Sequence, residues 1–227
     1  MNINSTFALI FLLSMEDSFL HKGLRRKLVQ ELVSKGISDQ NVLNAINNIP
    51  RHLFMDSGFV HFAYKDKAFP IAANQTISQP YTVAFQSQML EIKKGDKILE
   101  IGTGSGYQSA VLIELGAKVY TIERHKVLSM GAQTLLPQLG YRPQFFYGDG
   151  FKGLPTYAPF DKIIVTAGAP EMPTELLSQL SANGKMIIPI GDSDNQVMHL
   201  VEKNHDESLT ITEHGDFLFV PMLKGKK

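Results

Sequence analysis

The chain has 227 residues, with 22 Lys and Arg against 22 Asp and Glu, 7 His and no cysteine. Its length suits one α/β domain with a single core, and its balanced charge disfavours nucleic acid and membranes as partners. The absence of cysteine excludes disulfides, thiolate zinc sites and a cysteine nucleophile, and it fits a reducing compartment, so we expect a cytoplasmic protein; we also expect a monomer. No histidines are closely paired in sequence, so we expect no metal.

An apolar run at residues 7–13 is the first feature along the chain. It is too short to span a bilayer, and no basic residue precedes it as in a secretory signal. We expect residues 1–14 to be an extension before a natural start at Met15; if ordered, they must cover an apolar groove. We expect residues 15–80 to form N-terminal helices and a loop, and residues 81–227 to form the core of the same domain.

Two amphipathic helices and a long loop follow. Apolar residues recur at helical spacing over residues 20–33, and Ser38-Asp39 caps a second helix that Pro50 ends. Residues 50–81 are rich in aromatic and turn residues and have no sustained period. Such a loop in a compact domain is usually functional or disordered, and this one is too apolar to be disordered.

The end of this loop offers hydroxyl groups and backbone amides to an anionic substrate. Thr76 and Ser78 lie there, and no carboxylate falls between Phe69 and Tyr81. Ser78 has two interpretations: it contacts the substrate, or it merely caps the helix that begins near Tyr81 and runs to about residue 90.

From residue 97 onward, strands and helices alternate, which is typical of a doubly wound, mostly parallel sheet. Strands are predicted at residues 97–101, 118–122, 144–147, 160–166 and 184–190, and helices at 108–115, 127–139 with an interruption near Pro137, and 175–180. Two late β runs complete the sheet, at residues 196–202 and at 209–212 with 217–221.

The first of these strands leads into a glycine-rich turn. Glycines alternate there with hydroxyl residues: Gly102, Thr103, Gly104, Ser105 and Gly106. Alternate glycines let a nucleotide-like ligand lie against bare amides at the start of a helix, although a plain structural turn is the alternative. Glu100, just before the turn, would repel a pyrophosphate and suits a cofactor with a cationic head.

Two more acidic residues end the next predicted strands. Glu123 can accept hydrogen bonds from both ribose hydroxyls, and Asp149, with Gly150 beside it, from an adenine amino group. With Glu100, they predict a site for S-adenosylmethionine, whose product is S-adenosyl-L-homocysteine. Further residues are expected to line the cofactor and acceptor sides: Gln75, Thr76, Ile77, Val83, Thr166 and Pro221.

From about residue 16 to its end, the chain resembles the protein-L-isoaspartate O-methyltransferases, which are class I S-adenosylmethionine-dependent methyltransferases. The motifs are Pro50-Arg51-His52-x-Phe54, Ala63-Tyr64-x-Asp66, Gln75-Thr76-Ile77-Ser78-Gln79-Pro80-Tyr81, the glycine-rich turn with its flanks from Leu99 to Gln108, Gly148-Asp149-Gly150, Asp161-x-Ile163-Ile164-Val165-Thr166-Ala167 and Phe219-Val220-Pro221. The segment with Ser78 is the discriminating one, because class I methyltransferases at large share the glycine-rich turn.

This resemblance implies a Rossmann-like, doubly wound α/β fold with a seven-stranded sheet and an N-terminal helical extension. It implies methyl transfer to the free carboxylate of L-isoaspartyl residues in damaged proteins and peptides, which initiates repair through a succinimide. It also implies that Ser78 lies near cofactor and acceptor. A carboxylate is already ionised at neutral pH and needs no general base, so we expect Ser78 to orient the acceptor by a hydrogen bond and not to act as a nucleophile.

Three alternatives remain open from the sequence. A class I methyltransferase acting on a small molecule would share every cofactor feature. A nicotinamide-dependent oxidoreductase is disfavoured by Glu100 and by the early third glycine. A non-catalytic module would bind isoaspartyl segments without turnover.

Overall fold

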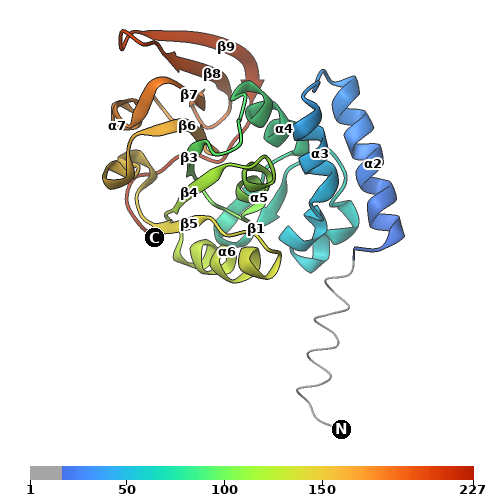
Figure 1. Cartoon of the computed structure of the whole chain (residues 1–227). Helices are drawn as coiled ribbons and strands as arrows, with labels where there is room; N and C mark the ends of the chain where they lie inside the picture. The colour runs from blue at the N-terminus through green and yellow to red at the C-terminus, as the bar shows by residue number, and fades with distance from the viewer. Residues whose placement is uncertain (1–16) are drawn as a thin grey trace.

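The computed structural model describes residues 17–227, and the run at residues 7–13, with the expectations about it, lies outside this part of the chain. A seven-stranded sheet with the order β5-β4-β3-β6-β7-β8-β9 forms the centre (Figure 1). The neighbours from β5 to β7 run parallel, whereas β8 and β9 pair antiparallel. The strands are β3 Lys97–Ile101, β4 Lys118–Glu123, β5 Gln144–Tyr147, β6 Phe160–Val165, β7 Leu180–Gly191, β8 Gln196–Lys203 and β9 Leu209–Phe217. This is the mostly parallel α/β sheet that the sequence predicts.

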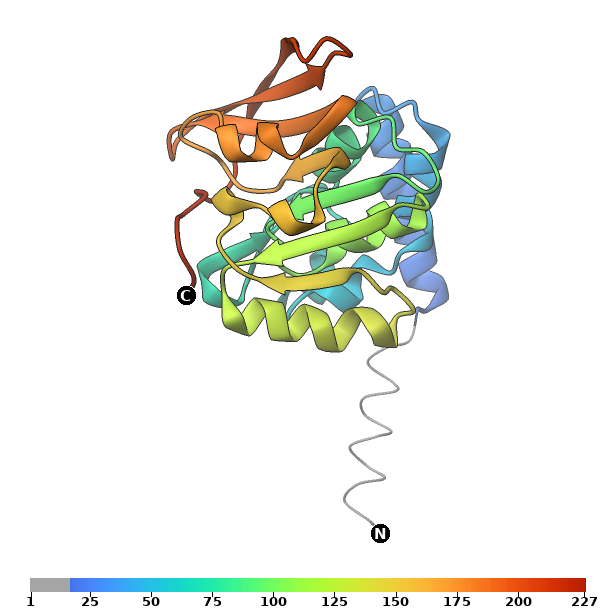
Figure 2. The same ribbon diagram turned by 60° about the vertical axis from the view of Figure 1, so that its left-hand side comes forward.

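Helices cover both faces of this sheet, so most residues of its central strands β3 and β6 are buried. The helices are α2 Phe19–Ser34, α3 Gln40–Asn48, α4 Pro80–Met89, α5 Tyr107–Glu114, α6 Lys126–Gln138 and α7 Thr174–Ser178. Side chains alternate between the faces along each strand. Ile98 and Ile164 pack with Leu112 of α5, whereas Leu99 and Ile163 share a core with α7. Figure 2 shows α7 on one side of the sheet, and α2 to α5 on the other.

Helices α2 and α3 begin where the sequence predicts them. The Ser18 side chain accepts a hydrogen bond from the His21 amide, and Asp39 caps α3 by accepting from the amides of Asn41 and Val42. Both helices pack with α4, α5 and α6 in one hydrophobic core. No helix in residues 17–227 is long and apolar enough to cross a membrane.

Residues 51–77, predicted as part of a long loop, form several short elements. These are the 3₁₀ helices η1 Arg51–Phe54, η2 Ser57–Phe62 and η3 Ala72–Asn74, and the antiparallel strands β1 Phe69–Ile71 and β2 Gln75–Ile77. Elements of 3 to 6 residues are too short to give a recognisable hydrophobic period. Strand β2 leads directly to Ser78, so this small sheet positions the acceptor loop.

Three details of the predicted elements are wrong. The interruption expected near Pro137 is absent, and α6 continues to Gln138; Pro137 lies in the last turn, where little of the helix follows it. Strand β7 begins at Leu180, pairing with Phe160 before its register shifts. Strand β9 runs unbroken to Phe217, and residues 218–221 lie outside it.

Candidate cofactor and acceptor site

A cavity lies where strands β3, β4 and β6 end, at the edge of the sheet where an open α/β fold binds ligands. The glycine-rich turn and the ends of β4 and β6 form one wall, and the β2–α4 segment forms the other. The lining residues are Gln75, Thr76, Ile77, Ser78, Val83, Ile101, Gly102, Thr103, Gly104, Ser105, Tyr107, Gln108, Ile122, Glu123, Arg124, His125, Gly150, Thr166, Ala167, Val220, Pro221, Met222 and Leu223. Most of the predicted site residues therefore gather in one place.

The turn after β3 requires its glycines. Gly102 has a φ of 94°, and a Cβ there would lie 2.6 Å from Oγ1 of Thr166. Gly106 has a φ of 85°, and its Cβ would lie 2.9 Å from Cδ1 of Leu136. Gly106 does not line the cavity; it is the N-cap of α5 and lets the helix begin against α6. A close-packed turn thus forms this part of the cavity wall, and the amides of Gly102 and Gly106 donate to backbone carbonyls of the protein itself.

Glu123, at the end of β4, connects two segments of the cavity wall. One carboxylate oxygen accepts from the Gly104 amide at 2.9 Å, and the other from the His125 amide at 2.8 Å. Its side chain also lines the cavity. A carboxylate oxygen can accept more than one hydrogen bond, so Glu123 retains capacity for a ligand hydroxyl.

Glu100 is placed differently from its prediction. It is fully buried and does not line the cavity, so the expected direct contact with a cationic head group is not seen. On β3 it faces the same side as Ile98, toward α5, where its carboxylate accepts a hydrogen bond from the Ser109 hydroxyl. Burial raises the pKa of this carboxyl to about 7.

Asp149 also lies outside the cavity lining, although its neighbour Gly150 is part of it. One Asp149 oxygen accepts from the Phe151 amide at 3.0 Å, and the other from the Gly225 amide at 2.8 Å. Asp149 thus holds the C-terminal segment, and its expected contact with an adenine amino group stays a prediction. The return of residues 222–227 to this edge could not be read from the sequence, because hydrogen bonds with residues far away in the sequence, such as Arg124 and Asp149, bring it about.

Ser78 stands between two cavities. It lines the cavity described above and also a second one of about 530 Å³, which Thr76 borders as well. The N-cap of α4 is Gln79, and the backbone amide of Tyr81 is bound instead by Asp66 at 2.7 Å. The interpretation of Ser78 as a helix cap is therefore wrong.

Comparison with known proteins identifies the family. The family model Protein-L-isoaspartate(D-aspartate) O-methyltransferase (PCMT) matches residues 23–227. The protein-L-isoaspartate O-methyltransferase of Christiangramia forsetii is 59% identical over 213 residues, which cover 93% of this chain and 100% of the relative. That of Salinibacter ruber is 44% identical, covering 91% of this chain and 94% of the relative. The chain belongs to the protein-L-isoaspartate O-methyltransferase family.

Solved structures of this family share the fold. A protein-L-isoaspartate O-methyltransferase structure superposes with a TM-score of 0.78 at 30% identity, covering 87% of this chain and 65% of the other. A putative family member from Plasmodium falciparum, in complex with S-adenosyl-L-homocysteine, gives a TM-score of 0.76 at 26% identity, covering 88% and 98%. The predicted fold class, family and enzyme class are confirmed, and that complex supports the predicted cofactor.

Several lining residues of this methyltransferase were not predicted. Tyr107 and Gln108 follow the glycine-rich turn, and Arg124 and His125 follow Glu123. The sequence could have indicated these residues only through their position next to residues that were predicted to line the site. Met222 and Leu223 gave no signal, because only the folded C-terminal segment brings them to the cavity.

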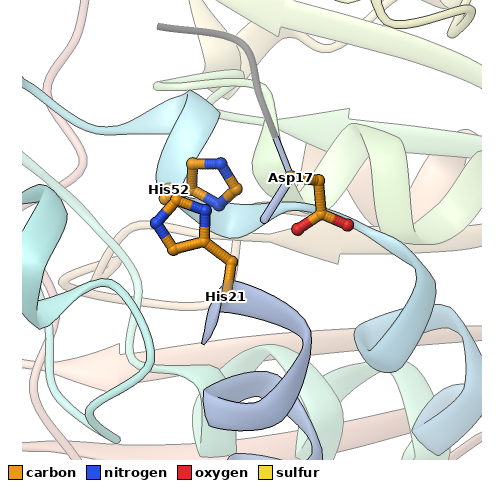
Figure 3. A group of neighbouring side chains, drawn as sticks. All are labelled: Asp17, His21 and His52. Carbon is orange, nitrogen blue, oxygen red and sulfur yellow. The ribbon is translucent and has the colours of Figure 1, made fainter. Parts of the chain in front are cut away.

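Asp17, His21 and His52 form a group that could be read as a metal site, since their ligand atoms lie within 4.8 Å of one another (Figure 3). The two imidazole rings lie one against the other in a tilted arrangement, with centroids 3.8 Å apart and planes 31° apart. Rings in face contact direct their in-plane lone pairs side by side, whereas metal ligands must converge on one point at about 2 Å. The group is thus arranged for packing, unlike a metal centre.

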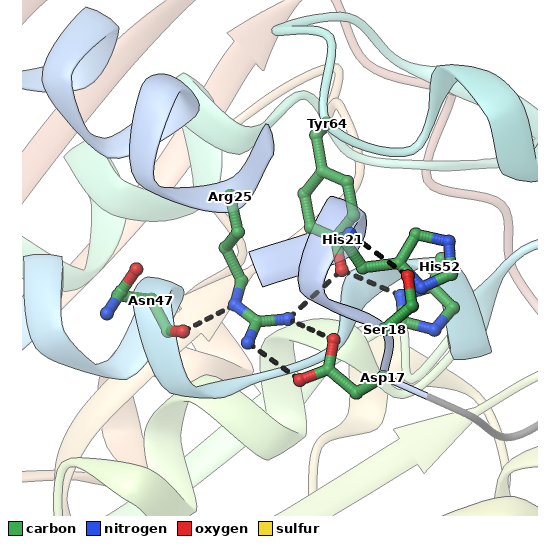
Figure 4. A network of polar contacts seen from close by, with 7 residues as sticks. All are labelled: Asp17, Ser18, His21, Arg25, Asn47, His52 and Tyr64. Carbon is green, nitrogen blue, oxygen red and sulfur yellow. Dashed lines mark hydrogen bonds and ion pairs between the residues drawn. The ribbon is translucent and has the colours of Figure 1, made fainter. Parts of the chain in front are cut away.

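This polar group instead attaches the start of α2 to α3, to η1 and to the turn that follows η2. Arg25 binds both carboxylate oxygens of Asp17, at 2.9 and 3.0 Å, and donates to the Tyr64 hydroxyl at 3.1 Å (Figure 4). The same hydroxyl lies 2.7 Å from Nδ1 of His52, and Arg25 also donates to the Asn47 carbonyl. Arg25 therefore connects α2 to neighbouring segments and does not line the cavity.

Proposed function

We propose that this chain transfers the methyl group of S-adenosylmethionine to the free carboxylate of L-isoaspartyl residues in damaged proteins and peptides. The methyl ester then closes to a succinimide, whose hydrolysis regenerates some normal aspartate. The observation that carries this proposal is the position of Ser78, which borders both the cavity at the glycine-rich turn and the second cavity beside it.

The cavity at the glycine-rich turn suits the cofactor. The backbone of residues 102–105 would hold its amino-acid part, and Glu123 its ribose. Gly150 would lie beside the adenine, and Thr166 and Pro221 would close the cavity from the side of β6. The bound cofactor supplies an electrophilic methyl group on a sulfonium.

The second cavity suits the acceptor. Its lining combines the hydroxyls of Thr76 and Ser78 with the aromatic rings of Tyr81 and Phe217. The acidic residue in this lining, Asp216, accepts a hydrogen bond from Asn195 at 3.1 Å. A peptide could therefore present a carboxylate to the hydroxyls while its neighbouring residues contact the rings.

Catalysis in this arrangement consists of alignment and exclusion of water. The acceptor carboxylate is ionised at neutral pH, and its charge cancels that of the sulfonium as the methyl group transfers. The Ser78 hydroxyl would donate a hydrogen bond to one carboxylate oxygen, which leaves the other oxygen directed at the methyl carbon. No proton has to be removed.

The test is transfer of labelled methyl from S-adenosylmethionine to two peptides that differ only in L-isoaspartate or L-aspartate at one position. Base-labile label on the isoaspartyl peptide alone supports the proposal. Binding of S-adenosylmethionine without labelling of either peptide would contradict it and favour a small-molecule acceptor. Binding of the isoaspartyl peptide without turnover would indicate a non-catalytic module.

A further inference from the structure

The segment from Ser78 to Tyr81 is fixed by side chains that lie far away in the sequence. The carboxylate of Asp66, whose side chain is 1% exposed, accepts from the Tyr81 amide at 2.7 Å and from the Gln79 side chain at 3.0 Å. Lys35, just after α2, forms an ion pair with the same carboxylate at 2.6 Å. Asp66 thus fixes the end of this segment where α4 begins.

Arg51 fixes the other end of the segment. Its Nη2 donates to the backbone carbonyl of Ser78 at 2.9 Å and approaches the carbonyl of Lys67 at 3.5 Å. Its guanidinium also lies over the ring of Tyr107, 4.8 Å from the ring centroid. Tyr107 is the first residue of α5, directly after the glycine-rich turn. Arg51 therefore contacts the Ser78 segment on one side and, on the other, the residue that directly follows the glycine-rich turn.

The environment of Arg51 is unfavourable for a charge. The side chain is 0% exposed, and burial lowers the pKa of the guanidinium to about 10, so it stays charged at neutral pH. Among residues 17–227, its Nε has no hydrogen-bond acceptor. The charge of Asp66 acts on it favourably. The burial of this charge is weak evidence that Arg51 stabilises the folded protein, because apolar residues of similar volume often give a fold that is equally stable.

We propose that Arg51 is a positioning residue, which sets the distance between Ser78 and the glycine-rich turn while Asp66 holds the rest of the Ser78 segment. This inference rests on the proposed role of Ser78. Methyl transfer requires the acceptor oxygen, the methyl carbon and the sulfur in line, and a displacement of about 1 Å can cost about 100-fold in rate. Arg51 contacts both parts whose separation determines that alignment, without touching cofactor or acceptor itself.

The test combines Arg51→Met with a matched control, Arg25→Met. Both variants remove a buried arginine from the N-terminal half of the molecule, but Arg25 binds Asp17 and Tyr64 and makes no contact with the Ser78 segment. We expect Arg51→Met to lower kcat on an isoaspartyl peptide by about 10- to 100-fold. The Kd of S-adenosyl-L-homocysteine should change by less than about 2-fold, and Arg25→Met should keep kcat near wild type.

A double variant shows whether Arg51 acts through Ser78. In the Ser78→Ala background, Arg51→Met should cause little further loss, because the hydroxyl that it positions is already absent. Equal fold losses in both backgrounds would overturn the proposal, and so would equal kcat values for Arg51→Met and Arg25→Met. If Arg51→Met does not fold, Arg51→Lys replaces it in the same cycle. An intermediate loss that disappears in the Ser78→Ala background supports the proposal, and a loss that persists there overturns it.

The experiment also separates this inference from the proposed function. If the wild-type chain leaves the isoaspartyl peptide unlabelled, or if Ser78→Ala alone keeps wild-type turnover, the proposed function fails regardless of Arg51. If Ser78→Ala lowers turnover and Arg51→Met does not, only the role of Arg51 fails.

Discussion

The two walls of the site are built in different ways. The cofactor wall consists of the glycine-rich turn and the ends of strands β4 and β6, and the buried parallel sheet holds them in place. The acceptor wall is a short segment whose position depends on Arg51 and Asp66, 27 and 15 residues from their backbone partners. Because the sheet fixes the cofactor wall, substitutions in the acceptor wall should leave cofactor binding intact. The same substitutions should disturb the alignment of acceptor and cofactor across the two walls.

The largest expected effect is on the acceptor wall. Ser78→Ala should lower kcat on an isoaspartyl peptide by about 100-fold or more, the cost of losing a donor that orients a reacting oxygen. The affinity for S-adenosyl-L-homocysteine, measured by calorimetry, should stay within about 2-fold. Ser178→Ala, an exposed serine of α7, is the control. A loss of cofactor affinity equal to the loss of kcat would show that the two walls are not separable.

Glu100 tests the sheet beneath the cofactor wall. The pKa of the Glu100 carboxyl is about 7 in the folded protein, against 4.5 for the carboxyl in the unfolded chain. As the pH rises, the unfolded chain therefore releases this proton first. Wild-type stability should therefore fall between about pH 4.5 and 7, by about 3 kcal/mol relative to the neutral Glu100→Gln variant. Urea unfolding of both proteins at pH 5 and pH 8 measures this. A stability difference that is the same at both pH values would contradict the buried, raised-pKa carboxyl.

Glu123 tests the cofactor wall directly. Glu123→Ala should weaken S-adenosylmethionine binding by about 1–3 kcal/mol, because hydrogen bonds to a charged acceptor are lost. The kcat at saturating cofactor should change much less than in Ser78→Ala. Glu114→Ala, on the exposed side of α5, is the control. Unchanged affinity would place the cofactor elsewhere.

The smallest effect compares two glycines. Gly106 and Gly140 have similar φ values of 85° and 88°, but a Cβ at Gly106 would meet Leu136 at 2.9 Å and one at Gly140 would meet nothing within 4 Å. Gly106→Ala should therefore destabilise the protein by about 1–2 kcal/mol more than Gly140→Ala. Thermal unfolding of the two variants isolates the contact, and equal melting temperatures would show that the turn relaxes freely.

The difference between the cofactor wall and the acceptor wall also determines how much of each could be predicted from the sequence. Strand β3 and the turn after it follow from a local pattern, so their positions were predicted correctly. The location of Glu100 was predicted wrongly. The prediction considered only that Glu100 lies at the end of a strand, and it neglected which face of the sheet the side chain points to. Asp149 and the Ser78 segment depend on contacts with Gly225, Arg51 and Asp66, distant in sequence, and no local periodicity encodes such contacts.

Strand β9 ends the sheet, so the backbone groups along its outer side have no neighbouring strand within residues 17–227. Such open edges are where strands of separate chains join during aggregation. Glu213 and Asp216 lie exposed along this edge, and their charges oppose another acidic strand directly across from them. Without these charges, the open edge of β9 would offer a second extended chain a strand to pair with.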